Sequence, residues 1–234
     1  MPAMVSRRTF LLSALGLGTL AASMALATPA HRIGALAQLA FEPDTNRRPP
    51  DMPVFIEPEP WEGRLIAGAE GQIGRTVSYD PAYERIAYPE GDVPIERGVC
   101  TDVIIRAYRS GLDVDLQALV HEDMRANFKA YPSMWGLNKP DPNIDHRRVP
   151  NLAVFFRRSE ASLPVSDDPR DYRPGDIVTQ TLPGGLAHIA LVTHRANADG
   201  TCPLVVHNIG AGARLEDVLF RFAITGHYRF FGTI

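Results

Sequence analysis

The sequence predicts an α+β protein in which several helices come first and a small antiparallel sheet follows. Between residues 62 and 156, apolar side chains recur at the three- and four-residue spacing of helices that bury one face. After Asp167-Asp168-Pro169 the pattern changes to short runs of β-branched and aromatic residues, separated by Pro-Gly-Gly and Asp-Gly turns. Helices grouped ahead of strands are typical of the α+β class, so we expect the N-terminal helices to pack on the sheet.

The elements can be placed in order along the chain. Apolar faces predict helices over residues 62–75 and 99–109. Asp113 and Asp115 are candidate caps for a third helix, and Pro150 suits the first turn of a fourth, short helix. The runs of β-branched and aromatic residues predict four strands, at residues 176–182, 187–194, 204–209 and 227–232.

The N-terminal part of the chain indicates export. Ser6-Arg7-Arg8-Thr9-Phe10 is a twin-arginine pattern, and the mildly apolar stretch after it ends in an A-x-A cleavage site, so residues 1–27 are expected to be a signal peptide for the periplasm. An ordinary secretory signal and an uncleaved anchor are the alternatives. Residues 28–60 contain seven prolines and are expected to form an extended tether. The folded domain is expected to span residues 61–234.

Composition excludes several classes of protein. Loss of Arg7 and Arg8 with the signal changes the formal net charge from −3 to −5, because residues 1–27 contain no acidic side chain. A mildly acidic chain lacks the basic surface that nucleic acids require, and no second apolar run approaches the ~20 residues of a membrane span. The His121-Glu122 and Asp141–Asp145 segments lack the remaining ligands of zinc and calcium motifs. We therefore predict no metal and no cofactor.

Cys100 is the most informative residue. It follows Gly98 and Val99 at the start of the helix expected over residues 99–109. Unpaired N–H groups and the positive end of the helix dipole stabilise a thiolate at such a position, so this pattern favours a nucleophilic cysteine. The alternative is a disulfide between Cys100 and Cys202, since disulfides are common in oxidising compartments.

A thiol nucleophile needs a base and a group that orients the base. His188 and His207 lie on two expected strands joined by a hairpin around Asp199-Gly200. Because side chains alternate along a strand, the registers centred on this turn put both histidines on one sheet face. His194, near the turn, and His227, at the start of the last expected strand, are interpreted as solvated or structural.

The order of Cys100, His188 and His207 resembles that of the NlpC-type cell-wall hydrolases, which are permuted papain-like cysteine peptidases. Tyr172–Val178 is similar to their Pro-Gly-Asp strand entry, and Tyr88 resembles a tyrosine that shapes their oxyanion region. The strings YDPAY, YPEGDVP, GVCTDVIIRAYR and DHRRVPNL more closely resemble a bacterial family of exported domains of unknown function within that superfamily. The chain departs from better-known members in its Val-Cys-Thr-Asp motif, in Ala190, and in residues 113–170, which have no simple counterpart and read as an insertion.

The resemblance implies cysteine-dependent hydrolysis of amide bonds in peptidoglycan stem peptides. Cys100 would attack the carbonyl as a thiolate held in an ion pair with His188, which then protonates the leaving amine. His207 would orient His188, while helix-start amides and Tyr88 bind the oxyanion. An acyltransferase or thioesterase using the same thiol is an alternative, as is a non-catalytic cell-wall binding module with a Cys100–Cys202 disulfide.

Three charged residues have open roles. Asp102 could cap or pair locally, for instance with Arg106 four residues later, or it could position the substrate. Arg147 and Arg148 could belong to a solvated salt-bridge network, or one of them could recognise a carboxylate on the substrate.

Overall fold

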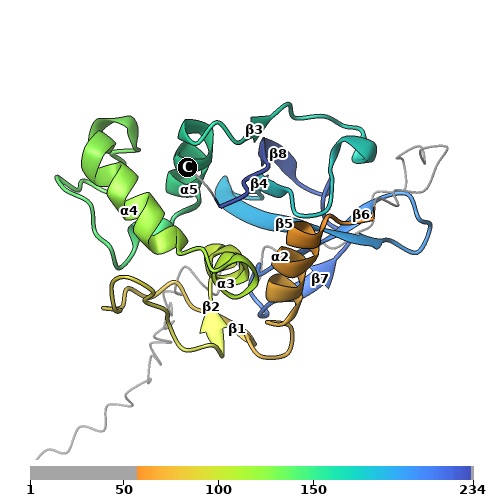
Figure 1. The fold of residues 1–234 in the computed structure, drawn as a ribbon, viewed down its shortest axis with the longest axis horizontal. Helices are drawn as coiled ribbons and strands as arrows, with labels where there is room; N and C mark the ends of the chain where they lie inside the picture. The colour runs from red at the N-terminus through yellow and green to blue at the C-terminus, as the bar shows by residue number, and fades with distance from the viewer. Residues whose placement is uncertain (1–56, 233–234) are drawn as a thin grey trace, which may run out of the picture.

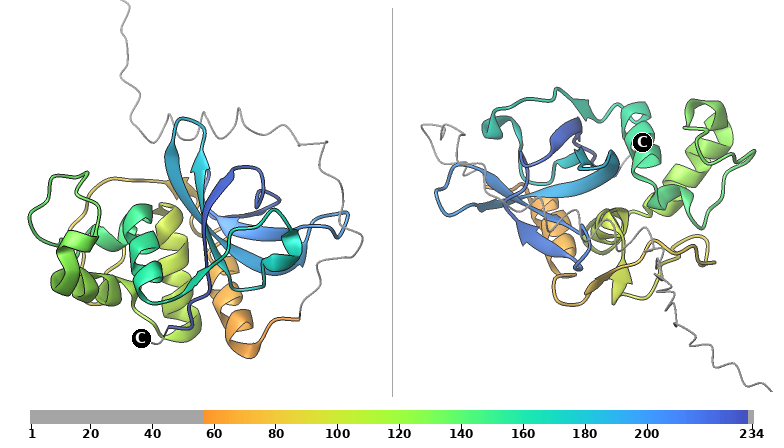
Figure 2. Two further views of the ribbon diagram at one scale, coloured as in Figure 1. Left: turned by 90° about the horizontal axis from the view of Figure 1, so that it is seen from above. Right: turned by 180° about the vertical axis from the view of Figure 1, so that it is seen from behind.

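The computed structural model describes residues 57–232, so the expected signal peptide and most of the expected tether lie outside the described residues. The described part is a mixed α+β fold, as predicted, with α-helices gathered on one side of an antiparallel sheet (Figures 1 and 2). Its helices are α2 (Pro60–Glu70), α3 (Cys100–Leu112), α4 (Leu116–Asn127) and α5 (Val149–Arg158), with 3-10 turns at Phe128–Ala130, Asp145–Arg147 and Pro169–Asp171. None of the helices within residues 57–232 is long and apolar enough to cross a membrane.

α2 and α3 cross closely because glycines remove side chains from their interface. A Cβ atom on Gly68 would lie 2.6 Å from Ser110 Oγ, and one on Gly111 would lie 2.4 Å from the Arg64 carbonyl oxygen. Without these Cβ atoms the two backbones can approach. α2 ends earlier than the expected residue 75, because the chain turns at Gly71, whose N–H bonds to the Ala67 carbonyl.

Residues 113–170 are part of the core. Asp115 caps α4 by accepting a hydrogen bond from the Gln117 amide at 3.1 Å, and α5 has proline in its first turn, as the sequence predicted. Phe155 and Phe156 of α5 are buried, and the Phe155 ring meets Phe230 edge to face at 5.5 Å between centroids. A segment that reads as an insertion therefore supplies a wall of the main hydrophobic cluster.

The main sheet has six antiparallel strands in the order β3-β8-β4-β5-β6-β7, and a short parallel pair, β1-β2, lies apart from it. The last strand was misplaced by the sequence analysis: it ends just after His227 and does not begin there, because the apolar residues beyond Tyr228 pack against the helices. The pair β1 and β2, and the strands β3 and β7, have only two or three residues and give no periodic signal. The strands are β1 (Ser78–Tyr79), β2 (Arg97–Gly98), β3 (Ser162–Leu163), β4 (Ile177–Leu182), β5 (Leu186–Ala196), β6 (Pro203–His207), β7 (Arg214–Glu216) and β8 (Ala223–Tyr228).

Both faces of the central strands are buried. Ile189 and Leu191 of β5 pack in the cluster that contains α3, whereas Ala190 and Val192 pack in a second cluster with Tyr172. This is the alternation expected of a strand, and it explains why β5 reads as an almost continuous apolar run. The sheet is therefore a rigid platform across which α3 lies.

The loop after β6 docks tightly on the segment that leads into β1. Gly212 has φ +86°, and a Cβ there would lie 2.2 Å from the Thr76 carbonyl oxygen, which accepts a hydrogen bond from the Ala213 amide at 2.8 Å. Gly185 has a similar φ of +77°, but a Cβ there would meet nothing within 4 Å. A substitution at Gly185 therefore introduces backbone strain alone, whereas a substitution at Gly212 introduces strain together with a steric clash.

We expect Gly185→Ala to lower the free energy of unfolding by about 1–2 kcal/mol, the cost of a left-handed conformation. Gly212→Ala should cost a further 1–3 kcal/mol, roughly, because its Cβ also collides with the Thr76 backbone. Urea unfolding of both variants beside the unchanged chain measures this difference. Equal losses would contradict the close docking of this loop.

Candidate functional site

Cys100 is the first residue of α3, and the turn that carries it is held by Asp102. The Asp102 carboxylate accepts a hydrogen bond from the Val99 amide at 2.6 Å, which satisfies a donor at the helix start. The Cys100 side chain is only 4 % exposed. Its sulfur accepts hydrogen bonds from the backbone amides of Ile189 and Thr101.

His188 and His207 are in direct contact. His188 Nε2 lies 3.0 Å from His207 Nδ1, and both residues are about 1 % exposed. The observed register pairs Leu191 with Val206, and continuing it puts His207 opposite Ala190, two residues from His188 on the same face. The prediction that the two histidines share a sheet face is confirmed.

The hydrogen-bonded chain continues to a residue that sequence reasoning missed. His207 Nε2 lies 2.9 Å from Glu216 Oε2. Glu216 belongs to β7, whose register pairs Val205 with Glu216, so that Glu216 and His207 share a face. A three-residue strand carries no period, and hence no signal in the sequence pointed to Glu216.

Cys100 contacts β5 through the backbone of Ile189. α3 packs across β5 and β6, and the Ile189 amide that contacts the sulfur belongs to the residue directly after His188. Because His188 Nε2 is engaged by His207, Nδ1 is the ring nitrogen of His188 that remains for another partner. The structure therefore brings the nucleophile candidate to the strand that carries the base candidate.

Burial changes the expected ionisation of this pair. Burial raises the pKa of the Cys100 thiol to about 12, although the hydrogen bonds from the Ile189 and Thr101 amides oppose the rise. Burial, and the neighbouring His207, lower the pKa of His188 well below its usual value. Burial therefore favours the neutral thiol and the neutral imidazole over the expected thiolate–imidazolium pair, because desolvation outweighs the amides at the helix start.

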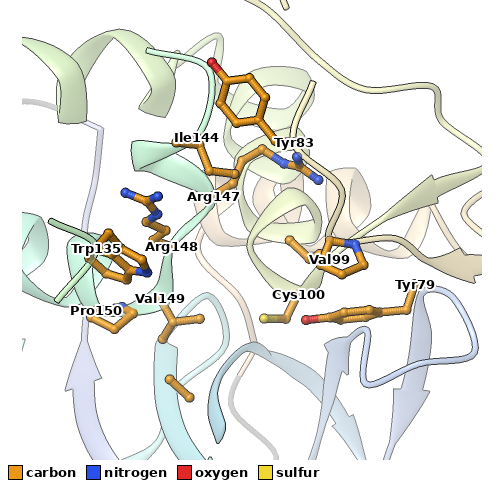
Figure 3. A pocket seen from close by; sticks show the side chains of 12 residues that line it. Tyr79, Tyr83, Val99, Cys100, Trp135, Ile144, Arg147, Arg148, Val149 and Pro150 are labelled. Atoms are coloured by element: carbon orange, nitrogen blue, oxygen red, sulfur yellow. The ribbon is translucent and has the colours of Figure 1, made fainter. Parts of the chain in front are cut away.

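Tyr79, and not Tyr88, lies beside Cys100. The Tyr79 hydroxyl hydrogen-bonds to the sulfur, and Figure 3 shows it pointing at Cys100. Burial, together with the nearby Cys100, raises the pKa of Tyr79. Tyr88 is 42 % exposed and packs on His121, with 4.9 Å between ring centroids. Tyr79 was missed because only the pairing of Tyr79 with Gly98 in the β1-β2 pair places it there.

Asp102 and Arg147 form a buried bidentate ion pair, with Arg147 Nε at 2.8 Å and Nη2 at 2.9 Å from the carboxylate oxygens. Arg147 also donates to the Ala82 carbonyl at 3.2 Å. The expected local pair between Asp102 and Arg106 is not formed, because Arg106 binds Asp92 at 2.8 Å. Asp102 and Arg147 hold the start of α3, and Arg147 also lines the pocket beside the sulfur.

A pocket of about 400 Å³ opens beside the sulfur. Figure 3 shows Cys100 and Tyr79 on one side of it and Trp135 and Arg148 on the other. The Arg148 guanidinium lies 4.2 Å from the centre of the Trp135 ring, and its Nη1 is 3.2 Å from Asp145 Oδ1. The pocket is lined by Tyr79, Pro81, Tyr83, Val99, Cys100, Trp135, Ile144, Arg147, Arg148, Val149, Pro150 and Ala187.

The remaining candidates are structural in this arrangement. Both cysteines are free, with Cys202 half-buried near the β5-β6 turn, which overturns the disulfide alternative. His227 is buried and lies 2.7 Å from Asp176, consistent with the structural role expected of it. Within residues 57–232, no cluster of three or more His, Cys, Asp or Glu side chains could hold a metal ion.

Fold and site together define an α+β domain with a buried thiol at a helix start and a His-His-Glu chain on neighbouring strands. The chain belongs to the family described as Domain of unknown function (DUF1287), which matches residues 66–230 and so includes every group of this site. It is similar to the protein named Uncharacterized protein YijF of Escherichia coli (strain K12). The two are 54 % identical over 193 residues, which cover 82 % of this chain and 93 % of that protein.

Burial of neutral histidines predicts acid lability. Burial lowers the pKa of His146 to about 3, and its Nδ1 has no hydrogen-bond partner, while the pKa of His188 is also lowered. The unfolded chain binds a proton on each below about pH 6.5 and the folded chain does not, so stability falls as the pH drops. Each histidine contributes a slope of about 1.4 kcal/mol per pH unit.

Replacing His146 with Gln removes one of these groups. We expect urea midpoints of the His146→Gln variant, measured from pH 6.5 down to pH 4, to give a slope that is shallower by about 1.4 kcal/mol per pH unit. Carboxylates contribute equally to both proteins and cancel in the difference. Parallel slopes would mean that His146 is protonated in the folded state.

Proposed function

We propose that this chain is a cysteine-dependent amide hydrolase with Cys100 as nucleophile, His188 as proton acceptor and donor, and His207 as the group that orients His188. One observation carries the proposal. The Cys100 thiol, at the first residue of α3, is hydrogen-bonded to the backbone amide of Ile189, which directly follows His188, and the His188 ring contacts His207 at 3.0 Å. A nucleophile, a base and an orienting group in series is the arrangement that covalent acyl transfer requires.

The neutral resting pair suggests how the reaction begins. As the Cys100 sulfur forms a bond to the amide carbonyl carbon, the thiol proton passes to His188. The carbon–nitrogen bond then breaks and the amine leaves with that proton. Water, losing a proton to His188, splits the thioester, and the proton returns to sulfur. Amides at the start of α3 and the Tyr79 hydroxyl are donors close to the reacting carbonyl, in the role first expected of Tyr88.

The substrate proposed is the peptide stem of the bacterial cell wall, reached by export through the twin-arginine route. The support is the resemblance to NlpC-type enzymes, including a permuted papain-like order in which the cysteine helix precedes the histidine strands. The pocket adds a chemical feature: Arg148 borders it, stacked on Trp135, and guanidinium groups recognise carboxylates. We propose that the substrate carries a carboxylate near the amide that is cut.

Digestion of purified peptidoglycan, with fragments identified by mass, tests the reaction. We expect fragments that have gained one water per cut, and a loss of more than about 10³-fold in rate for Cys100→Ala, which removes the nucleophile. Cys202→Ala is the matched control, since that thiol lies by the β5-β6 turn and should leave the rate unchanged.

Two outcomes would contradict this reading. Turnover retained by a folded Cys100→Ala protein would exclude the thiol as nucleophile. Products joined to an acyl acceptor in place of water would assign the same thiol to acyl transfer.

Arg148→Met tests the carboxylate contact. We expect KM to rise by about 10–100-fold for a peptide with a free carboxylate, the value of a charge-assisted hydrogen bond, and to change little for the amidated peptide. Arg158→Met serves as control, because Arg158 pairs with Asp123 on the surface and does not line the pocket. Equal KM changes for both peptides would remove Arg148 from recognition.

A further inference from the structure

Glu216 ends the hydrogen-bonded chain that starts at His188. Its carboxylate is 2.9 Å from His207 Nε2, and Arg214 lies 3.9 Å from its other oxygen. Burial raises the pKa of Glu216, but the hydrogen bond from His207 and the nearby Arg214 outweigh it and lower the pKa below its usual value. Glu216 is therefore ionised at neutral pH and can only accept hydrogen bonds.

Because the Glu216 carboxylate can only accept, it determines which atom donates in each of the two hydrogen bonds between Glu216 and His188. The Glu216 carboxylate requires a proton on His207 Nε2, so the Nδ1 of a neutral His207 has a lone pair. That lone pair requires a proton on His188 Nε2, which lies 3.0 Å away. His188 Nδ1 is then unprotonated and can take a proton.

We propose that Glu216 is a positioning residue that, through His207, fixes His188 in the tautomer whose Nδ1 can accept the Cys100 proton. The transfer of the Cys100 proton to His188 rests on the proposed function, whereas the tautomer of His188 does not. Without Glu216, His207 can hold its proton on Nδ1 and donate to His188 Nε2. His188 then carries its own proton on Nδ1, where it blocks transfer from the thiol.

Burial makes this control effective. His188 and His207 are each about 1 % exposed, so water does not offer their ring nitrogens alternative partners. Glu216, with 19 % of its side chain exposed, borders a hollow with Arg195 and Arg214 that shares no residue with the pocket at Cys100. The chain of bonds thus runs from a separate surface of the molecule to His188.

Nitrogen-15 spectra of histidine-labelled full-length protein read the tautomer directly, with His188→Gln assigning the signals. At pH 8 we expect His188 protonated at Nε2 in the unchanged chain. In Glu216→Ala the form protonated at Nδ1 should gain population. Asp217→Ala is the matched control: it removes the neighbouring carboxylate, which bonds to Asn197, and should leave the tautomer unchanged.

Alkylation of Cys100 by iodoacetamide, in a Cys202→Ala background, supplies a readout that needs no natural substrate. General-base assistance contributes at least about 10²-fold, so we expect Glu216→Ala to slow alkylation, and kcat on any cleaved peptide, by about that factor with KM unchanged. Glu216→Gln keeps the shape of the side chain but can donate as well as accept, so it should show a mixture of tautomers and an intermediate rate.

Three results would overturn the proposal: an Nδ1-protonated His188 in the unchanged chain, an unchanged tautomer in Glu216→Ala, or an unchanged alkylation rate in that variant. Should the alanine variant fail to fold, the glutamine variant decides by the same two measurements. Absence of peptidoglycan cleavage by the unchanged chain would count against the proposed function alone, because the tautomer and the alkylation rate are measured independently.

Discussion

The buried ion pair between Asp102 and Arg147 is the interaction on which the site depends. One carboxylate caps the first turn of α3 through the Val99 amide and binds the Arg147 guanidinium with both oxygens. Removing either partner from such a pair leaves an uncompensated buried charge, at a cost of about 3–5 kcal/mol. The pair also joins the cysteine helix to the loop before α5, so it sets the position of the pocket wall at Arg148 relative to the sulfur.

The segments around the sulfur are held by a second layer of polar contacts. Asn208, directly after His207, donates to the carbonyl of Gly98 at 3.0 Å and to that of Ser78 at 3.3 Å. Gly98 lies two residues before Cys100, so the side chain of the residue after His207 is hydrogen-bonded to the backbone that leads to Cys100. Arg106 adds hydrogen bonds to the carbonyls of Val93, Pro94 and Arg97. These contacts make the thiol and the histidines parts of one rigid unit.

Burial has two opposite effects on the proposed chemistry, because it strengthens hydrogen bonds within the site and disfavours the charged forms of the reacting groups. It removes water from the thiol and the imidazoles, which strengthens the hydrogen bond between His188 and His207, and it also disfavours charge on Cys100 and His188. The structure offsets this with donors aimed at the sulfur, namely the amides of Ile189 and Thr101 and the Tyr79 hydroxyl.

Much of the molecule can be predicted from sequence because local patterns carry it. Periodicity identified the long helices and central strands, a breaker before an apolar stretch placed Cys100 at a helix start, and alternation put His188 and His207 on one face. What only the tertiary structure decided involves short or distant segments: Tyr79 reaches the sulfur through a two-residue parallel pair, and Glu216 reaches His207 from a three-residue strand. Ionisation was also decided there, because the pKa of Cys100 depends on how deeply it is buried, and burial is a property of the packed fold.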